Sequence, residues 1–371
     1  MTSGKVVSCM QEFGCRRSRG EFQRIVSEMK KKANILVFGA AGFIGTYLID
    51  ELIIEGFGVL ASDISDIGEN YYREQNIPYL AIDITNKDDF KSLEDAQFDA
   101  IIHLAALQPA NFSVNYSPSD YIKINVDGTL NILEYCRVSK TKKIIYASSH
   151  RNTSGLWHKN VPIKEEYGRS QQYNGEYSMF SISESAAQDC VEYYNANYDI
   201  RGVILRLPPV YGYGPHLEIF KNGKPIRTGF QTFIENAINC RPLEVWGDAT
   251  VGRDIIYVKD VVSAIIKAIK SDNARGLYNI SSAYRLTLKE EVETIAKVFW
   301  GNDQPPEFIA NPEKQHSMDS FVYDNSKAKR ELGWEPRFNF ENLLLDYKKE
   351  LGANKFGFLI EKRKKMFGKK T

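Results

Sequence analysis

Short apolar runs alternate along the first half of the chain with longer segments of mixed polarity. The first run occupies residues 35–38, and further runs follow at 58–61, 99–104, 143–147 and 203–207. Continuous apolar runs of this length are typical of strands buried on both faces of a parallel sheet. Each interval is long enough for a helical crossover, so the pattern predicts an α/β fold with a doubly wound parallel sheet of Rossmann type.

The pattern changes after Pro208, where loops rich in glycine, proline and tyrosine follow. Helical periodicity returns at residues 258–269, 288–299 and 340–351. This change predicts a smaller C-terminal α/β domain, partly interleaved with the first. We therefore expect a basic extension over 1–33, a nucleotide-binding domain over 34–206 with a return segment at about 254–274, a substrate-binding domain mainly over 207–348, and a basic tail over 349–371.

Composition narrows the class of protein. The chain has 371 residues, enough for two domains, and its net charge of +1 creates no overall field that favours nucleic acid. Five cysteines without a CxxC pair favour reduced thiols and a cytoplasmic location. The histidines are scattered without a carboxylate at ligand spacing, so we expect no metal. The tail interleaves basic and apolar residues, which leaves three alternatives: a solvated segment, a helix that packs on a partner, or weak contact with a membrane surface.

A glycine-rich loop follows the first predicted strand and opens a helix. It reads Gly39, Ala40, Ala41, Gly42, Phe43, Ile44, Gly45. Glycines allow the backbone to turn tightly against a pyrophosphate, and the helix N-terminus offers N–H groups to the phosphates. The pattern therefore predicts a dinucleotide site at residues 39–45.

Acidic residues after the next two apolar runs extend this predicted site. Asp63 lies 24 residues beyond Gly39, where a carboxylate accepts hydrogen bonds from the adenosine ribose and repels a 2′-phosphate, which favours NAD over NADP. Asp83 and Ile84 are placed to reach the adenine edge. Capping of the segment 86–93 is the alternative role of Asp83.

Nine motifs together resemble the extended short-chain dehydrogenase/reductase family over residues 34 to 348. In chain order they are GAAGFIG at 39–45, Asp63, Asp83 with Ile84, HLAA at 103–106, NVDGT at 125–129, LR at 205–206, VYG at 210–212, RDIIYVKD at 253–260 and LGWEP at 332–336. The resemblance implies NAD as cofactor, a nucleotide-activated sugar as substrate and a homodimer. It also implies an epimerase, dehydratase, 4-keto reductase or dehydrogenase, of the kind used in polysaccharide biosynthesis.

The resemblance also implies roles for residues outside the glycine loop. The implied cofactor contacts are Leu104, Ala105, Ala106, Asn125, Tyr177 and Pro208, and the implied substrate contacts are Gln108, Ser149, His150, Val210, Gln231 and Arg253. Arg253 is expected to bind the diphosphate through paired, charge-assisted hydrogen bonds.

The sequence departs from the family at the catalytic base. The family uses a tyrosine with a lysine four residues later, and Tyr177 aligns with that tyrosine while Ser181 stands in place of the lysine. A phenol with a pKa of ~10 is a poor base unless a cation stabilises the phenolate. The chain has one Tyr-x-x-x-Lys pair, Tyr323 and Lys327, which we expect to lie far from the cofactor.

A second departure follows the strand at 143–147. The family has a serine or threonine there that binds a substrate oxygen, and in our register His150 takes this place after Ser148 and Ser149. Two interpretations stay open. His150 acts as an acid or base, or supplies the missing positive charge; alternatively, His150 only caps the loop and Ser149 keeps the family role.

Two classes of function are compatible with these features. The first is an NAD-dependent enzyme that acts on a nucleotide-activated sugar by tyrosine-assisted hydride transfer, with Tyr177, Ser149, His150 and Ser181 as the candidate catalytic residues. The alternative is a catalytically impaired member that serves as a nucleotide-sugar or NAD-binding regulatory protein, because a fold persists when chemistry is lost.

Overall fold

The computed structural model describes residues 33–94, 96–109, 116–159, 161–215, 219–221, 224–314 and 319–361. The predicted N-terminal extension and the end of the predicted tail therefore lie outside the described residues. Within the described ranges, no helix combines the length and apolar character needed to cross a membrane.

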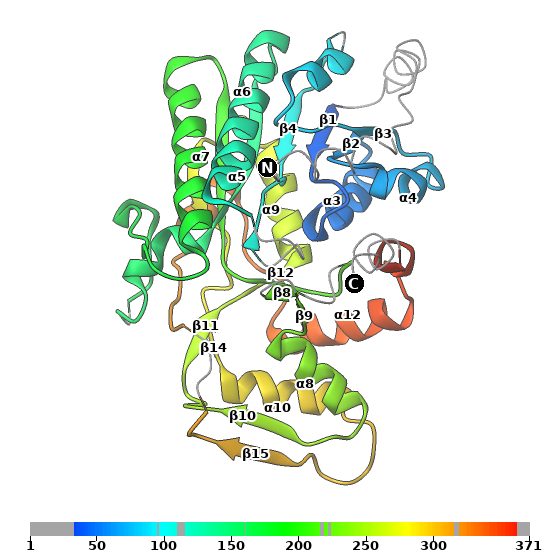
Figure 1. The fold of residues 1–371 in the computed structure, drawn as a ribbon, viewed down its shortest axis with the longest axis vertical. Helices are drawn as coiled ribbons and strands as arrows, with labels where there is room; N and C mark the ends of the chain where they lie inside the picture. Colours follow the sequence, from blue (N-terminus) through cyan, green and yellow to red (C-terminus); the bar gives the residue numbers. More distant parts are fainter. Residues whose placement is uncertain are drawn as a thin grey trace.

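A seven-stranded sheet forms the upper part of the molecule (Figure 1), and all its neighbouring strands run parallel. Its order is β13-β6-β5-β4-β1-β2-β3, so the direction of winding reverses between β1 and β4. Ligands of open parallel sheets bind at such a switch point. The strands are β1 (Asn34–Phe38), β2 (Gly58–Asp63), β3 (Tyr79–Ala81), β4 (Ala100–His103), β5 (Lys143–Ser149), β6 (Arg201–Leu207) and β13 (Gly276–Asn279).

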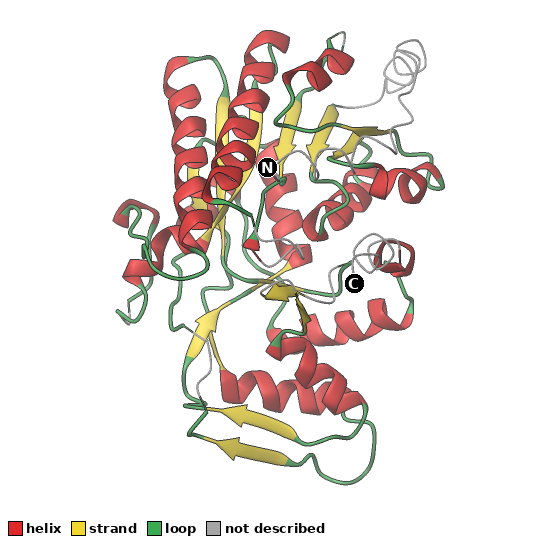
Figure 2. Ribbon diagram, viewed as in Figure 1, coloured by secondary structure: helices red, strands yellow, loops and turns green. Residues whose placement is uncertain are grey.

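Helices cover both faces of this sheet (Figure 2). Ile35 and Val37 of β1 join one buried cluster with side chains of α3 and α9, whereas Leu36 and Phe38 join another with side chains of α6 and α7. Consecutive residues of a strand point to opposite faces, so burial on both faces explains the continuous apolar runs. The helices are α3 (Phe43–Ile54), α4 (Glu69–Arg73), α5 (Pro118–Tyr121), α6 (Gly128–Ser139), α7 (Ser178–Asn197) and α9 (Val258–Lys270). The fold class expected from the sequence is confirmed.

Short helical turns join these elements. Four are 3-10 turns, η2 (Asp66–Gly68), η3 (Lys87–Leu93), η6 (His150–Leu156) and η7 (Glu165–Tyr167), and η5 (Ile122–Asp127) is a π-helical turn between α5 and α6.

The smaller C-terminal part is built from paired strands and four helices. Its strand pairs are β7 (Val210–Tyr211) with β12 (Ile256–Tyr257), β8 (Ile219–Lys221) with β9 (Lys224–Ile226), β10 (Leu243–Trp246) with β15 (Phe308–Asn311), and β11 (Gly252–Asp254) with β14 (Arg285–Thr287). Its helices are α8 (Gly229–Ile238), α10 (Leu288–Phe299), α11 (Ser326–Leu332) and α12 (Phe340–Gly352), and α10 packs on both α8 and α12.

The two parts are interleaved along the chain. After α9, strand β13 joins the sheet beside β6, so the returning chain continues past the expected segment at 254–274. The LGWEP motif has a structural role in this interleaving: the Trp334 indole is buried, and its N–H donates to the Asp260 carbonyl at 3.1 Å. Asp260 in turn accepts the backbone N–H groups of Arg337 and Phe338.

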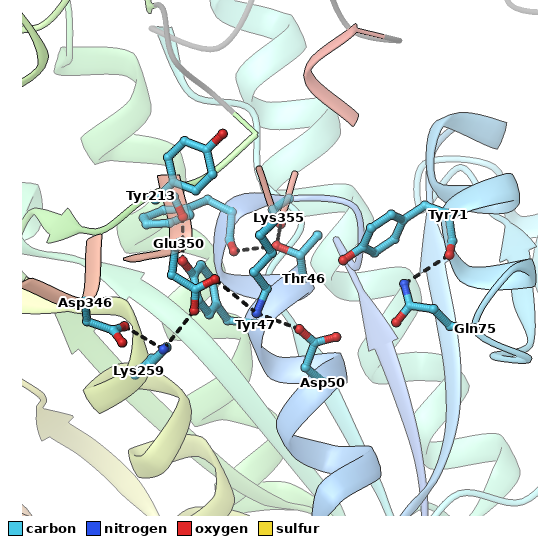
Figure 3. Close-up of polar contacts among 12 residues, drawn as sticks. Thr46, Tyr47, Asp50, Tyr71, Gln75, Tyr213, Lys259, Asp346, Glu350 and Lys355 are labelled. Atoms are coloured by element: carbon cyan, nitrogen blue, oxygen red, sulfur yellow. Dashed lines mark hydrogen bonds and ion pairs between the residues drawn. The ribbon is translucent and has the colours of Figure 1, made fainter. Parts of the chain in front are cut away.

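The beginning of the predicted tail packs into the protein core. Phe356, Leu359 and Ile360 are buried in the same cluster as α3 and α9. Lys355 places its Nζ 2.8 Å from the Asp50 carboxylate and above the Tyr47 ring (Figure 3). The expected tail boundary at 349 also falls inside α12. The side chains of Phe356, Leu359 and Ile360 face the protein, so residues 355–360 are not a freely solvated segment. The rest of the predicted tail, from 362 on, lies outside the described residues, so partner or membrane contact there stays a prediction.

We expect Lys355→Met to lower the free energy of unfolding by about 1 kcal/mol, the upper end for ion pairs of limited burial. Lys355 and Asp50 are 22% and 28% exposed, so solvent screens their attraction only in part. Lys329→Met is the matched control, because Lys329 and Glu335 are 67% and 63% exposed and such pairs contribute little. Urea unfolding of both variants checks this expectation, and equal losses would contradict it.

Candidate active site

The glycine loop lies at the switch point of the sheet. Gly39 directly follows β1 with φ +82°, and a Cβ at this position would lie 2.8 Å from the Ala105 nitrogen beyond β4. A Cβ on Gly45 would lie 2.2 Å from the Gly39 carbonyl oxygen. Only glycine is tolerated at these two positions, because any Cβ would clash with neighbouring backbone atoms. The loop backbone can therefore approach a ligand closely at the start of α3.

Asp63 orders this loop from the end of β2. Its Oδ2 accepts the Ala41 N–H at 3.0 Å, and its Oδ1 accepts the Ile64 N–H at 2.9 Å. The Asp63 carboxylate therefore lies beside the glycine loop at the carboxyl edge of the sheet. This is the edge at which the sequence analysis predicts that Asp63 binds the adenosine ribose. Helix α3 begins after Gly42, an N-cap residue without a side chain, and Phe43 and Ile44 form its first turn. These features fit a bound dinucleotide, because the helix N-terminus favours its phosphates.

Asp83 and Ile84 have local structural roles. Asp83 Oδ1 accepts the N–H and the hydroxyl of Thr85, while Asn86 caps η3. The expected alternative, capping of 86–93 by Asp83, is corrected in favour of Asn86. Ile84 is buried against Gly128, so its side chain contributes to core packing.

Asn125 holds the segment that follows β4. Its amide donates to the Leu107 carbonyl at 3.2 Å and to Ser183 Oγ at 2.9 Å, and its Oδ1 accepts the Leu107 N–H at 2.7 Å. Both amide N–H groups are used in this way. Asn125 therefore positions the segment at residue 107, and its contact with the cofactor stays a prediction.

The other expected cofactor and substrate contacts lie around the same edge. Leu104, Ala105 and Ala106 are half-buried after β4, and Pro208 is buried after β6. Gln108 is exposed, and the chain at 110–115 lies outside the described residues.

Tyr177 is the N-cap residue of α7, and its ring packs edge-to-face on Phe180. Ser181 lies one turn along, buried, with its N–H donating to the Tyr177 carbonyl at 2.9 Å. Burial raises the pKa of Tyr177, and Glu176 adds to this effect, whereas Arg151 and Arg253 lower it. Tyr177 thus lies among cations although the position of the family lysine is neutral.

His150 occupies an aromatic stack. Its ring packs against two aromatic rings that also stack on each other: its centroid lies 5.7 Å from that of Trp157 and 5.6 Å from that of Phe321, which are 4.7 Å apart. Its Nδ1 contacts the Leu207 carbonyl oxygen at 3.1 Å. Burial lowers the pKa of His150 well below 6.5, and the charges of Arg151 and Arg253 lower it further. This shift disfavours the hypothesis that His150 supplies a positive charge near neutral pH.

Ser149 caps the turn after β5. Its Oγ accepts the Arg151 N–H at 3.2 Å, which leaves its own proton available to donate. The capping role that the sequence allowed for His150 thus belongs to Ser149.

Arg253, in β11 of the smaller part, is the second arginine whose charge acts on Tyr177. Its Nη2 donates to the Tyr211 hydroxyl at 3.0 Å, which donates to Glu291 at 3.2 Å, and its Nε is buried without a partner among the described residues. Burial alone would lower the pKa of Arg253, but Tyr211 and Glu291 raise it above its ordinary value. A buried guanidinium with an unused donor suits an anionic ligand.

The remaining predicted substrate residues, Val210 and Gln231, lie in β7 and α8 of the smaller part. Val210 lies in β7, and its neighbour Tyr211 contacts the Phe230 ring at 4.4 Å. Gln231 lies in the first turn of α8, capped by Thr228. Aromatic side chains therefore line the side of α8 that meets Tyr211.

The side chains of Tyr323 and Lys327 have separate structural roles. The Tyr323 hydroxyl lies 2.6 Å from Thr153 Oγ1 and donates to the His150 carbonyl at 3.2 Å, so this tyrosine buttresses the η6 turn and is not far from the site. Lys327 donates instead to the Leu277 carbonyl at 2.7 Å. The two side chains are not a catalytic pair.

Arg151 is the functional candidate that sequence reasoning missed. It follows His150 directly, and nothing in its spacing marks it, because its position over Tyr177 arises from the η6 turn. Among the described residues, no cluster of histidine, cysteine and carboxylate side chains suits a metal ion.

The glycine loop, Asp63 and the polar edge around Tyr177 define a Rossmann-type dinucleotide-binding protein. Residues 35–281 match the NAD dependent epimerase/dehydratase family, and the chain belongs to this family. An uncharacterized protein of Methanocaldococcus jannaschii is 30% identical over 327 residues, 84% of this chain and 94% of that protein.

Relatives with assigned names are similar over most of their length. The UDP-glucose 4-epimerase of Mycolicibacterium smegmatis is 27% identical over 307 residues, 81% of this chain and 93% of that protein. The structure of a Thermotoga maritima UDP-glucose 4-epimerase with UDP-glucose superimposes with a TM-score of 0.72 at 25% identity, and the match covers 86% of this chain and 99% of that chain.

Proposed function

We propose that this protein is an NAD-dependent enzyme that acts on a UDP-activated sugar by an epimerase or dehydratase type of reaction. The observation that carries the proposal is the Arg151 guanidinium 4.0 Å above the centroid of the Tyr177 ring, at an edge where the charge of Arg253 from the smaller part also lowers the pKa of that tyrosine. The names of the relatives support uridine diphosphate as the activating group.

Each side chain has a role in this proposal. Bound NAD supplies a hydride acceptor beside the sugar. The Tyr177 phenolate accepts the proton of a sugar hydroxyl, and the Ser149 hydroxyl donates a hydrogen bond to a sugar oxygen, in keeping with its free donor. Arg253 binds the diphosphate, and Tyr211 and Glu291 hold its guanidinium in place. Gln108, Val210 and Gln231 are the further proposed substrate contacts.

A panel of UDP-sugars, incubated with the protein and NAD and followed by proton NMR of the anomeric signals, tests the proposal. New sugar signals from one substrate are the expected result. Binding of neither NAD nor any UDP-sugar would overturn it. Binding of both ligands without conversion would favour the alternative, a regulatory protein, for which the neutral Ser181 is the supporting observation.

We expect NAD to bind more tightly than NADP by about tenfold or more, because the Asp63 carboxylate repels a 2′-phosphate. Asp63→Asn keeps the size of the side chain and an acceptor for the Ala41 N–H, so this variant isolates the charge. Calorimetric titration of both cofactors checks the expectation. The preference for NAD over NADP should be smaller in Asp63→Asn than in the unmodified protein. Equal affinities of the unmodified protein for NAD and NADP would contradict the role of Asp63.

The proposal also includes a homodimer and a cytoplasmic location. Val138 on α6 and Tyr193 on α7 are 66% and 56% exposed and offer apolar contact area on neighbouring helices. The thiols of Cys136, Cys190 and Cys240 are free, in keeping with a reducing compartment.

A further inference from the structure

The charge that a phenolate base needs is absent from the helix that carries Tyr177. Ser181, one turn along α7, is 3% exposed and neutral. The neighbouring His150 packs against Trp157 and Phe321, and burial lowers its pKa well below 6.5, which disfavours a charged imidazole. A base at Tyr177 therefore requires a cation from another element.

Arg151 reaches Tyr177 from the η6 turn. Its guanidinium carbon lies 4.0 Å from the centroid of the Tyr177 ring and 5.4 Å from that of Trp157. Its backbone N–H is held by Ser149 Oγ at the end of β5. The turn that presents Arg151 is braced by Tyr323, whose hydroxyl contacts both Thr153 and the His150 carbonyl.

No other described group neutralises this guanidinium. Within the described ranges, no carboxylate forms an ion pair with Arg151, although the charge of Asp319 raises its pKa. Burial lowers that pKa from 12.5, but arginine stays protonated in proteins. The positive charge over the ring is therefore present at every pH at which the fold is stable.

We propose that Arg151 is a positioning residue that stabilises the Tyr177 phenolate and so takes over the charge of the lysine that Ser181 replaces. This inference rests on the proposed function. The charged and titratable groups that face Tyr177 are Arg151, Arg253, Glu176 and Tyr121. Arg253 is held by Tyr211, and Glu176 carries the opposite charge, which leaves Arg151 as the cation in direct contact with the ring.

The experiment measures the Tyr177 phenol directly. The full-length protein is labelled with tyrosine carrying ¹³C at Cζ, and the signal of Tyr177 is assigned by its absence in Tyr177→Phe. Arg151→Met removes the charge and keeps much of the apolar stem, whereas Arg151→Lys keeps the charge. Arg201→Met is the matched control, because Arg201 begins β6 at the opposite end of the sheet.

We expect Arg151→Met to raise the Tyr177 pKa by about one unit or more, since an opposite charge within ~4–6 Å has an effect of this size. Arg151→Lys and Arg201→Met should leave it nearly unchanged. With a UDP-sugar that is turned over, Arg151→Met should lower kcat about tenfold at neutral pH and leave KM nearly unchanged. It should also displace the acidic limb of the pH profile, on which activity rises as Tyr177 loses its proton, to higher pH.

Unchanged titration of Tyr177 in a folded Arg151→Met protein would overturn the inference. A raised KM with an unchanged kcat would also overturn it, because Arg151 would then be a substrate contact. If Tyr177 responds as expected while no variant, including the unmodified protein, converts a UDP-sugar, the charge assignment stands and the proposed function fails. Should Arg151→Met not fold, the Arg151→Lys variant decides. A Tyr177 pKa in Arg151→Lys that differs from that of the unmodified protein would overturn the inference.

Discussion

Tyr177→Phe should lower kcat for the UDP-sugar by about 10²–10⁴-fold, the range that a positioned acid or base contributes. The substitution deletes only the phenolic oxygen, and the ring that packs on Phe180 remains. The affinity for NAD should therefore stay within about twofold of that of the unmodified protein. The lost oxygen acts in turnover, and the substitution removes little that stabilises bound NAD. Single-turnover kinetics with calorimetric titration of NAD measures both quantities.

Tyr173→Phe is the matched control for this variant. Tyr173 lies in the same connection before α7 and is 77% exposed, so its hydroxyl has no role in the site. Its turnover should equal that of the unmodified protein. Persistent turnover in Tyr177→Phe would mean that another group is the base, and Ser149→Ala would then be the next variant to measure.

Arg253→Ala should weaken binding of the UDP-sugar by about 2–5 kcal/mol, which corresponds to roughly 30- to 5,000-fold in Kd. Arg253 is half-buried, and its buried Nε has no partner among the described residues, so the guanidinium can offer a charge-assisted hydrogen bond to a diphosphate. Removal of the arginine also leaves Glu291 buried without its neighbouring cation, which raises the pKa of that carboxyl further. Isothermal titration with the UDP-sugar measures the loss.

The adjacent strand offers a matched control for Arg253. Arg285 on β14 pairs in register with the neighbouring Asp254 and is exposed, so Arg285→Ala changes the same overall charge away from the proposed diphosphate site. Its affinity for the UDP-sugar should remain unchanged. Equal losses in the two variants would show a general electrostatic effect and would move the diphosphate away from Arg253.

Local patterns predicted the nucleotide-binding part because each element there depends on neighbours in sequence. The apolar runs of β1 and β4 reflect burial on both faces of the sheet. The glycines at 39 and 45 reflect backbone contacts within one strand, turn and helix. Asp63 follows from its place at the end of the next strand.

Such local patterns could not predict contacts between side chains that are distant in sequence. Asn125 resembles a cofactor ligand in a motif, yet its amide is used by Leu107 and Ser183, which are distant in sequence. The basic tail has the composition of a surface segment, yet Phe356 is buried because α3 and α9 leave an apolar face for it.

The sequence by itself determined the sheet, the glycine loop, the likeness to a family and the absence of a lysine at Ser181, since all of these are properties of residue order and spacing. Only the tertiary structure decided which charge faces Tyr177. His150 and Arg151 are consecutive, but the η6 turn directs the imidazole into a stack with Trp157 and Phe321 and the guanidinium over the tyrosine ring. Electrostatic effects depend on distance and burial, and these quantities exist only once the chain is folded.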